Sequence, residues 1–444
     1  MKIIVIGGVA AGMSAASKVK RTLPTSQVVV YEKGEDLSYG ACGLPYYVGD
    51  EIKDIKSLVI RNKAQFEKSG IEVFDLHEVL SVNEKDKKIK VKNLRTEEEF
   101  YDDYDKLIVA TGASPIRPDW EGGNLDNIHV LSNLNDGLLI KTSVLKEEIR
   151  NVIIVGGGFI GVELAENINK LGKNVTLIEA QKQILTHLDI EMSEMLKTEM
   201  TKNGIKVKNN ESVLRFYGST KVEGVVTDHD KYEADLVILA IGVRPNTKMF
   251  SDAQISKLKN GALKVNNKME TSIPDIYAAG DCASVYHRLK DSNEEYIPLA
   301  TNANKQGKLI GSIIGGRSGE FLGALGTSMI KVFQLEGAKT GLSEKEAIQM
   351  GVDYITKTIK SHNHASYYPN SQSITIKLVA DKQTHQLLGV QIVGFSGSAL
   401  RINTAAVAIH AKLSTDELGW IDFGYAPPFS ATWDALQVAC NVIS

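Results

Sequence analysis

Cysteine is scarce in this chain, which carries only Cys42, Cys282 and Cys440 among its 444 residues. Their odd number and wide spacing argue against a disulfide framework and against a zinc site, so we predict no structural metal. No run reaches the roughly 18 apolar residues that a membrane helix needs. The opening MKIIVIGG is too short in its apolar run for a secretory signal. We therefore expect a cytoplasmic protein.

A charge excess of either sign is also lacking, since 51 Lys and Arg residues face 54 Asp and Glu residues. This balance argues against nucleic-acid binding as the main role. The composition, with 43% apolar and 24% charged residues, is that of a globular protein. A chain of this length exceeds one hydrophobic core, and we expect roughly two to four domains.

Two copies of a strand, a glycine turn and a helix are present. KIIVIGGVAAGMSAASKVKR is followed by VVVYEKGE, which ends its strand in Glu32. The pattern returns in NVIIVGGGFIGVELAENINKLGKNVTLIEA, which ends in Glu179. Such units bind dinucleotides: the pyrophosphate rests on the helix N-terminus and the acidic residue bonds a ribose. The second turn has all three glycines, whereas Val9 takes the middle position in the first.

Two shorter segments, YDKLIVATGASP (104–115) and ADLVILAIGVRPN (234–246), each predict a buried strand that runs into a glycine turn. A further strand, in TSIPDIYAAGDCASV, ends at Gly280 and Asp281, where we expect a helix to begin. The Asp281 carboxylate is predicted either to cap that helix or to bond a ribityl hydroxyl.

The order of these segments resembles the pyridine nucleotide–disulfide oxidoreductases, and the resemblance covers essentially the whole chain. It implies an α/β fold: two Rossmann-like dinucleotide-binding domains, for FAD and for NAD(P)H, plus a C-terminal α+β dimerisation domain. The FAD-binding domain would span 1–112 and 245–325, the NAD(P)H-binding domain 113–244 and the dimerisation domain 326–444. A homodimer with its active site at the interface follows, without the rhodanese domain that some members append.

The resemblance also implies the residues that contact the two cofactors. Glu179 favours NADH, because a carboxylate bonds a 2′-hydroxyl and repels a 2′-phosphate, although nearby Lys182 leaves NADPH open. Phe159 matches an aromatic gate over the flavin face, and Glu163 matches a carboxylate near the nicotinamide. The predicted cofactor contacts are Gly7, Gly8, Ala10, Ala11, Gly12, Glu32, Lys33, Val79, Ala110, Thr111, Gly112, Gly156, Gly158, Phe159, Ile160, Gly161, Glu163, Glu179, Gly242, Gly280, Asp281, Leu299 and Ala300.

Cys42 follows Glu32 by ten residues, in SYGACGLPYYVG, where the family places its redox thiol. The small residues beside it leave the sulfur accessible. A helix that begins near it would lower the thiol pKa and favour thiolate. Two-cysteine members carry CxxxxC here, whereas this chain has no second cysteine. The redox partner of Cys42 should therefore be a small molecule.

Three chemistries remain open for such a lone thiol. It could form a mixed disulfide with a low-molecular-weight thiol, cycle through sulfenic acid as in NADH peroxidases and water-forming NADH oxidases, or reduce polysulfide. A flavin redox sensor with little turnover is the alternative that is not an enzyme. Oxidase relatives place a histidine in the first glycine loop, where this chain has Ala10 and Ala11.

GGVAAG and CGLPYYVG instead resemble the coenzyme A-disulfide reductases, as do Tyr367 in HASYYPNS and Tyr425 in GYAPPFS. The resemblance places both tyrosines across the dimer interface, where they would donate a proton to leaving coenzyme A thiolate. It implies that NADH reduces the flavin and that the flavin reduces a Cys42–S–S–coenzyme A adduct. Ala41 departs from the family, which often has Asn there. The predicted substrate contacts are Ser38, Lys18, Arg21 and Arg61.

Overall fold

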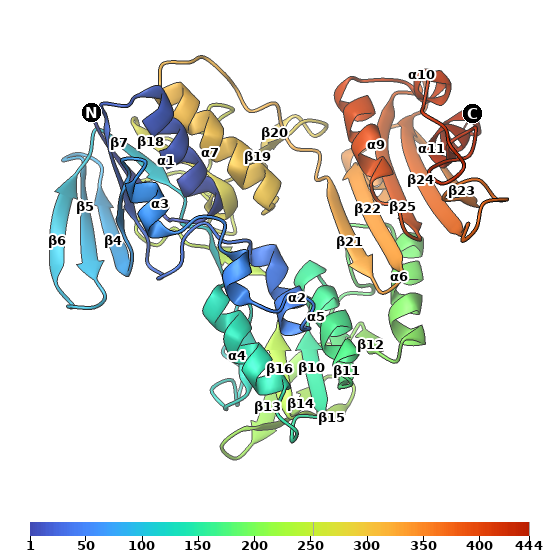
Figure 1. Ribbon diagram of the computed structural model, residues 1–444, viewed down its shortest axis with the longest axis horizontal. Coiled ribbons are helices and arrows are strands. Elements are labelled where there is room, and N and C mark those ends of the chain that lie inside the picture. The colour runs from blue at the N-terminus through green and yellow to red at the C-terminus, as the bar shows by residue number, and fades with distance from the viewer. Residues whose placement is uncertain (252, 444) are drawn as a thin grey trace.

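Three five-stranded sheets organise the chain, and the computed structural model describes residues 1–251 and 253–443. Each sheet lies in its own lobe, so the molecule has three lobes, with the middle of the chain below the other two (Figure 1). This arrangement confirms the predicted fold class. The exact domain limits stay a prediction, and residues 252 and 444 within them lie outside the described residues.

The first sheet is parallel throughout and has the strand order β18-β7-β1-β2-β3. The inner strands β1, β2 and β7 are buried on both faces over most of their length, which explains their continuous runs of Ile, Leu and Val. Helices α1 and α7 pack against it, and a second, antiparallel sheet of β4, β5 and β6 contributes to the same core. The bounds are β1 Lys2–Ile6, α1 Ala10–Thr22, β2 Gln27–Tyr31, β3 Glu72–Phe74, β4 His77–Asn83, β5 Lys88–Asn93, β6 Glu99–Asp103, β7 Lys106–Val109, β18 Ile276–Ala278 and α7 Ala300–Ile314.

Helix α7 joins this unit from late in the chain because two of its glycines lie against α1. A Cβ at Gly307 would lie 2.1 Å from the carbonyl oxygen of Ala11, and one at Gly311 would lie 2.7 Å from that of Ala15. Any side chain at these positions would separate the helices. The close contact therefore fixes α7 beside the first glycine turn.

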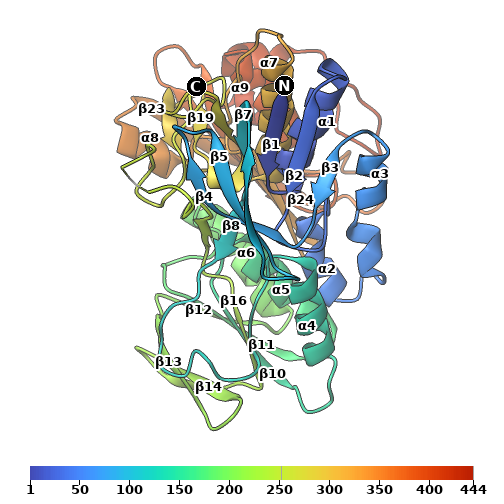
Figure 2. The same ribbon diagram turned by 90° about the vertical axis from the view of Figure 1, so that its left-hand side faces the viewer.

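The second sheet, in the lower lobe, is also parallel and has the order β12-β11-β10-β16-β9 (Figure 2). Helix α2, which follows Cys42, packs into the core of this lobe although it belongs to the N-terminal part of the chain. The bounds are α2 Leu44–Val48, β9 Ile128–Val130, α4 Leu134–Val144, β10 Asn151–Val155, α5 Phe159–Lys170, β11 Asn174–Glu179, α6 Ile190–Lys202, β12 Lys206–Asn209, β13 Val213–Gly218, β14 Val222–Thr227, β15 Lys231–Glu233 and β16 Leu236–Leu239. Helix α3 (Lys63–Glu67) packs in the core of the first lobe instead, through Phe66.

The chain enters and leaves the lower lobe through two short strands that pair with each other. β8 (Ala113–Pro115) and β17 (Val243–Pro245) run antiparallel. Beside them, Thr111 Oγ1 donates to the carbonyl oxygen of Asn246 at 2.6 Å, and Asn246 Nδ2 donates to the carbonyl oxygen of Thr111 at 3.0 Å. The two glycine-turn segments that looked alike in sequence are therefore direct neighbours.

The third sheet is antiparallel, with the order β21-β22-β25-β24-β23, and helices of the C-terminal segment pack on it. This lobe carries many exposed apolar side chains. The bounds are β21 Ser328–Val332, β22 Leu335–Gly341, α8 Glu344–Met350, β23 Tyr354–His362, β24 Ser373–Asp381, β25 Leu387–Gly394, α9 Arg401–His410, α10 Thr415–Trp420 and α11 Ala435–Asn441. The hairpin of β19 (Val285–His287) and β20 (Ser292–Glu295) precedes this lobe, and its Val285 packs in the core of the first lobe.

One local expectation is wrong. At Gly280 and Asp281 the strand β18 leads into a three-residue 3-10 turn, Gly280–Cys282, and not into an α-helix. No described side chain caps this turn, so Asp281 is not a helix cap. Within the described residues, no helix is both long enough and apolar enough to cross a membrane.

Candidate active site

The first glycine turn brings three backbone segments together at the ends of parallel strands. Gly7 follows β1 with φ of +107°, and a Cβ there would lie 2.1 Å from the carbonyl oxygen of Ala110, which follows β7. A Cβ at Gly12 would lie 1.9 Å from the carbonyl oxygen of Gly7. Both positions therefore require glycine, and the close approach leaves a cradle of backbone at the start of α1.

The second turn repeats this geometry. Gly156 has φ of +108°, and its Cβ would lie 2.4 Å from the carbonyl oxygen of Ala240 after β16. A Cβ at Gly161 would lie 1.9 Å from the carbonyl oxygen of Gly156. The repeat predicted from the sequence is therefore present in three dimensions.

The acidic residue at the end of each second strand is held at the mouth of its cradle. Glu32 Oε2 accepts the backbone N–H of Gly8, and Glu179 Oε2 accepts that of Gly157, both at 2.6 Å. The second oxygen of Glu179 accepts from the backbone of Gln181 at 2.7 Å. Each carboxylate is thus oriented in the position where the predicted ribose contact needs an acceptor.

The middle glycine position faces open space, which explains how Val9 can replace glycine in the first turn. A Cβ at Gly158 would meet no atom within 4 Å. Among the described residues, no side chain caps the N-terminus of α1 or α5. The first amide groups of both helices are therefore available for a pyrophosphate, and both cradles fit a dinucleotide.

Several other predicted cofactor residues lie close to the first turn. A Cβ at Gly280 would lie 3.2 Å from Cβ of Ala11, and the Gly280 amide donates to Gln306 of α7 at 2.8 Å. Burial raises the pKa of the neighbouring Asp281. Leu299 and Ala300 form the start of α7.

The remaining predicted cofactor residues are more scattered. Val79 is buried in the core of the first lobe, whereas Lys33 is exposed and forms an ion pair with Glu78 at 2.8 Å. In the lower lobe, Ile160 is exposed at the start of α5, and Gly242 adopts a φ of +111° directly before β17.

Cys42 lies on an exposed 3-10 turn, Ala41–Gly43, that leads directly into α2. The predicted helix is present, but the predicted lowering of the thiol pKa is wrong. Desolvation by the surrounding protein raises the pKa of Cys42, and the negative charges of Glu163 and Asp281 raise it further. The amide dipoles of the five-residue α2 do not outweigh these effects.

Tyr46 and Glu163 form a hydrogen-bonded pair beside this cysteine, which was not predicted from the sequence. The Tyr46 hydroxyl, one helical turn after Cys42, donates to Glu163 Oε1 at 3.2 Å. Burial raises the pKa of Glu163 to about 7, although the bond from Tyr46 opposes this shift. Glu163 can therefore hold or release a proton near neutral pH.

The neighbouring Tyr47 has a packing role. Its side chain is buried, and the Lys141 ammonium of α4 lies 4.2 Å from the centre of its ring. Of the adjacent pair of tyrosines, only Tyr46 faces the site.

Phe159, the predicted aromatic gate, stacks on His187. Their ring centroids lie 4.5 Å apart with an interplanar angle of 28°. Burial lowers the pKa of His187 to about 3, so the imidazole is neutral and packs as an aromatic ring. His187 belongs to the linker between β11 and α6.

Tyr367 and Tyr425 lie together although 58 positions separate them. Their hydroxyl groups are 2.5 Å apart, and both side chains are exposed on the C-terminal lobe. The hydrogen bond to Tyr367 raises the pKa of Tyr425, so this phenol keeps its proton at neutral pH. Among the described residues no hydrogen bond joins either tyrosine to the Cys42 segment of the same chain.

Four cations lie close together in the first lobe. Lys18 and Arg21, both predicted substrate contacts, lie on α1, and Lys308 and Arg317 come from α7 and the segment after it. Partial burial, together with the charges of Arg317, Arg21 and Lys308, lowers the pKa of Lys18. None of the four forms an ion pair with a carboxylate among the described residues.

The other two predicted substrate contacts differ in their surroundings. Ser38 has a φ of +47°, and its amide donates to the carbonyl oxygen of Gly8 in the first glycine turn. The Arg61 guanidinium folds back on α3, donates to Gln65 and Ser69 at 3.1 Å, and lies 4.1 Å from the centre of the Phe66 ring. Arg61 is thus already engaged within its own segment.

Cys282 and Cys440 are buried, which leaves Cys42 as the exposed thiol of the described chain. The Cys282 thiol donates to the carbonyl oxygen of Ala279 at 3.3 Å, and Cys440 packs in the core of the C-terminal lobe. Cys282 thus packs as a small residue in the core of the first lobe.

Comparisons with known proteins cover the whole chain. A family model described as pyridine nucleotide-disulphide oxidoreductase matches residues 1–307, and the dimerisation domain of the same family matches residues 327–436.

Two relatives span nearly the entire sequence. A protein of Pyrococcus horikoshii named NAD(P)H coenzyme A polysulfide/persulfide reductase is 38% identical over 444 residues, covering 100% of this chain and 98% of its own. A coenzyme A disulfide reductase of Staphylococcus aureus is 31% identical and covers 98% of both chains. Among solved structures, the water-forming NADH oxidase of Lactobacillus brevis bound to NADH has a TM-score of 0.95 and 29% identity, covering 99% of this chain and 97% of that one.

Proposed function

The chain belongs to the pyridine nucleotide-disulphide oxidoreductase family, and on this premise we propose that it reduces coenzyme A disulfide with NADH, through a mixed disulfide at Cys42. Family membership makes it an oxidoreductase that uses FAD and a nicotinamide coenzyme. The observation that carries the choice of substrate is the Tyr367–Tyr425 pair.

The tyrosine pair suits a thiolate leaving group. Two phenols whose oxygens are 2.5 Å apart share one hydrogen bond, so at least one O–H remains free to donate to a third atom. Both side chains are exposed, and Tyr425 keeps its proton at neutral pH because the hydrogen bond to Tyr367 raises its pKa. A leaving coenzyme A thiolate would accept one of these protons.

The four-cation cluster supports a substrate that carries phosphates. Lys18, Arg21, Lys308 and Arg317 repel one another unless an anion lies between them. Phosphate groups meet this requirement, because Arg and Lys are their usual ligands. Coenzyme A joins phosphates and a thiol in one molecule, and each of these parts matches a site described above.

The proposed chemistry at Cys42 balances as follows. The Cys42 thiolate attacks one sulfur of the disulfide, the S–S bond breaks, and the released thiolate takes a proton from Tyr425 or Tyr367. The Cys42–S–S–coenzyme A bond would then split into two thiolates on receiving the two electrons of NADH, which FAD would supply when bound. One NADH and one proton are consumed for each disulfide, and two molecules of coenzyme A thiol form.

The residues of the two cradles would hold the cofactors. For FAD these are the first glycine turn with Glu32, together with the turns at 110–112 and 280–281 and the start of α7. For NADH they are the second glycine turn with Glu179, beside Phe159. Because Glu179 presents a carboxylate to the ribose and is anchored by Gly157 and Gln181, NADH should bind better than NADPH.

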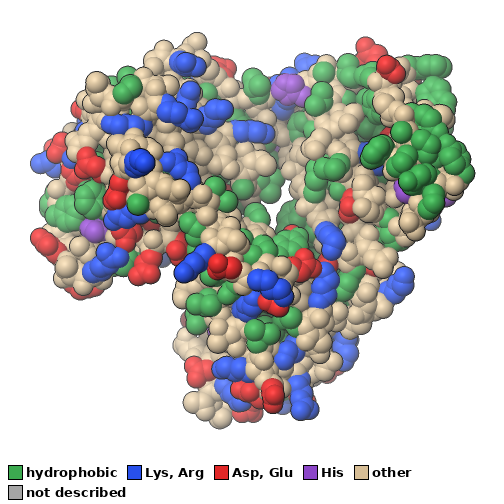
Figure 3. Space-filling view, viewed as in Figure 1, with side chains coloured by type: hydrophobic (Ala, Val, Ile, Leu, Met, Phe, Trp, Pro, Cys, Tyr) green, Lys and Arg blue, Asp and Glu red, His purple; other side chains and the backbone are tan. Residues whose placement is uncertain are grey.

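We further propose a homodimer in which the C-terminal lobe of one chain covers the Cys42 region of the other. Apolar side chains gather on this lobe (Figure 3). They include Trp420 and Phe429, which are 76% and 77% exposed, a degree that monomeric proteins avoid. The matched dimerisation domain, residues 327–436, covers most of this lobe, and we propose the three-domain division with limits near 112, 245 and 325. With its three cysteines free, the enzyme would act in the cytoplasm.

A polysulfide or persulfide reductase is the second candidate, because the relative with 38% identity is named for these substrates and for coenzyme A. In that case coenzyme A would serve as the thiol carrier on Cys42 and the four cations would keep their role.

Mass spectrometry of the denatured, unreduced protein tests the proposal. We expect an adduct of coenzyme A mass on Cys42, which reductant removes and which Cys42→Ser lacks. A sulfenic acid without a thiol adduct would overturn the proposal in favour of an NADH oxidase. Steady-state assays of NADH with coenzyme A disulfide, polysulfide and oxygen would then rank the substrates.

A further inference from the structure

The linker between β11 and α6, residues 180–189, lies between the second glycine turn and the C-terminal lobe. Toward the turn, the amide of Leu185 donates to the carbonyl oxygen of Gly157 at 2.8 Å. A Cβ at Gly157 would lie 2.7 Å from Cγ2 of Ile184, so the two segments are in direct contact. Two residues further on, His187 stacks on Phe159. This end of the linker is therefore part of the wall around the second cradle.

The other end of the linker is fixed by the C-terminal lobe through Asp189. The backbone N–H of Asp189 donates to Oε1 of Gln391 on β25 at 2.7 Å, and Nε2 of Gln391 donates to the Asp189 carboxylate at 2.6 Å. The backbone N–H of Glu344, at the start of α8, donates to the same carboxylate at 3.0 Å. Asp189 thus receives hydrogen bonds from two elements of a different lobe, and both it and Gln391 are buried.

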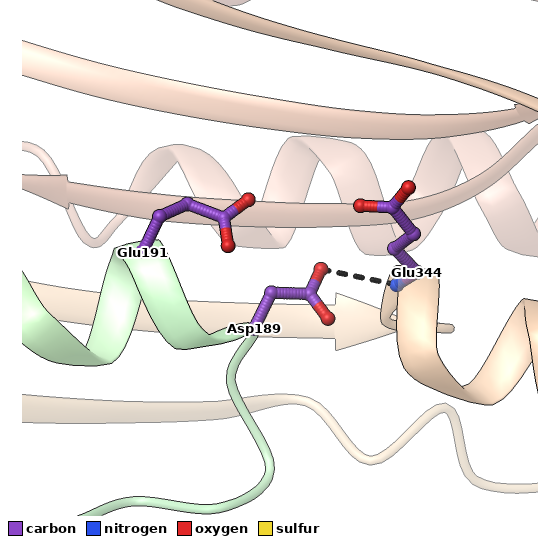
Figure 4. Close-up of side chains that lie close together, drawn as sticks. All are labelled: Asp189, Glu191 and Glu344. Carbon is purple, nitrogen blue, oxygen red and sulfur yellow. Dashed lines mark hydrogen bonds between the residues drawn. The ribbon is translucent and has the colours of Figure 1, made fainter. Parts of the chain in front are cut away.

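Lys377 of β24 completes this anchor. Its side chain is only 3% exposed, and its ammonium lies 3.0 Å from Asp189 and 2.6 Å from Glu344 and also contacts Glu191. The three carboxylates converge from α6, α8 and the linker (Figure 4), in the manner of a cation site. Here the cation is the lysine itself. Although burial opposes it, bonding to the three carboxylates raises the pKa of Lys377, so it stays charged.

We propose that Lys377 and Gln391, both in the C-terminal lobe, are positioning residues for the nicotinamide site. By holding Asp189 they fix residues 184–189, and these fix the ring of Phe159 through His187. The inference rests on the proposed function in one respect, namely that NADH binds at the second cradle beside Phe159.

The linker needs such an external anchor. Between residues 180 and 189 it forms no helix or strand, and Leu185 adopts a φ of +47°, which a leucine rarely occupies. A segment without a repeating hydrogen-bond pattern loses order readily when one end is released. Loss of the hydrogen bond from the Asp189 backbone N–H to Gln391 should therefore release the linker residues that line the second cradle.

Gln391→Met tests this with little change of volume and leaves Lys377 paired with all three carboxylates. Lys377→Met is the stronger perturbation. Lys331→Met is the matched control, because Lys331 of β21 also joins the C-terminal lobe to the lower lobe, through Glu166 on α5 at 3.4 Å, but does not touch the linker. Each FAD-loaded variant is mixed anaerobically with increasing NADH in a stopped-flow instrument, and amide exchange of residues 180–189 is measured on the same samples.

We expect Gln391→Met to raise the apparent dissociation constant of NADH roughly tenfold, as for the loss of one hydrogen bond to a charged group, with a smaller change in the limiting rate. Exchange in the linker should quicken, while Lys331→Met stays at wild-type values. A folded Gln391→Met enzyme with wild-type NADH binding and wild-type linker protection would overturn the inference, even if Lys377→Met does not fold. If the wild type is not reduced by NADH, the proposed function fails, and linker exchange alone decides whether the anchor is real.

Discussion

Replacing Glu163 with glutamine should raise the free energy of unfolding, and this gain over wild type should grow as the pH rises. The buried carboxyl has a pKa of about 7 instead of its ordinary 4.5, so the fold favours its neutral form. Stability from this group is complete below pH 4.5 and is lost as the pH rises through 7. Glutamine stays neutral at every pH, so the variant does not lose this stability.

The size of the effect follows from the pKa. Ionising this carboxyl inside the protein costs about 3 kcal/mol relative to the unfolded chain. The gain in free energy of unfolding for Glu163→Gln over wild type should therefore grow from about 1 kcal/mol at pH 5 to about 3 kcal/mol at pH 8. Urea unfolding across this pH range measures it, with the exposed Glu147→Gln in the same lobe as the control.

The same substitution reports on Cys42, because the Glu163 charge raises the pKa of that thiol. Glu163→Gln should lower the Cys42 pKa, so iodoacetamide should modify Cys42 at a lower pH than in wild type. A gain in stability that does not change between pH 5 and pH 8, together with an unchanged alkylation profile, would refute the reasoning for both residues.

The remaining predictions concern the two half-reactions. Cys42→Ser should lose disulfide reduction and keep rapid anaerobic flavin reduction by NADH, as stopped-flow absorbance would show. Tyr425→Phe should lower turnover with coenzyme A disulfide by roughly 100-fold, which is the usual contribution of a positioned general acid. Tyr367→Phe should lower turnover less, because Tyr425 keeps its own proton. Lys18→Gln should raise KM for coenzyme A disulfide without changing flavin reduction, and added salt should weaken wild-type binding more than that of the variant. Glu179→Ala should reduce the preference for NADH over NADPH, measured as the ratio of kcat/KM values.

The two dinucleotide cradles could be predicted from the sequence because their determinants are local. Gly7, Gly12, Gly156 and Gly161 each make a contact, within a few residues or with an adjacent strand, that admits no Cβ. The tolerance of the first turn for Val9 could not be predicted. The open space at the middle position depends on neighbouring residues that the glycine pattern does not include.

The misjudged features depend on contacts between distant positions. The helix after Cys42 was predicted correctly, but its effect on the thiol pKa was outweighed by burial and then by the charge of Glu163, which lies 121 positions later. The role of Tyr46 could not be predicted from the sequence, because its hydrogen-bond partner is that same carboxylate, 117 positions away. Lys377, in the strand SITIKLV, would be taken for a solvent-facing residue, since its partner Asp189 comes from another lobe.

Lys308 and Arg317 could have been found only by recognising the pair of helices that brings them to Lys18. The sequence feature that indicates such a pair of helices is Gly307 and Gly311 of α7, which are spaced for a close helix contact. The identity of the opposing helix is not encoded in that spacing.

The antiparallel pair of β8 and β17 makes the lower lobe an insertion whose two ends are tied together. The first sheet continues from β7 to β18 across this junction, as if the residues between them were absent. A related lobe could therefore be joined at this ribbon without changing the register of the first sheet, provided that it keeps the surfaces that α2 and the C-terminal lobe contact. Thr111 and Asn246, which bind each other across the ribbon, mark where such a graft should be cut.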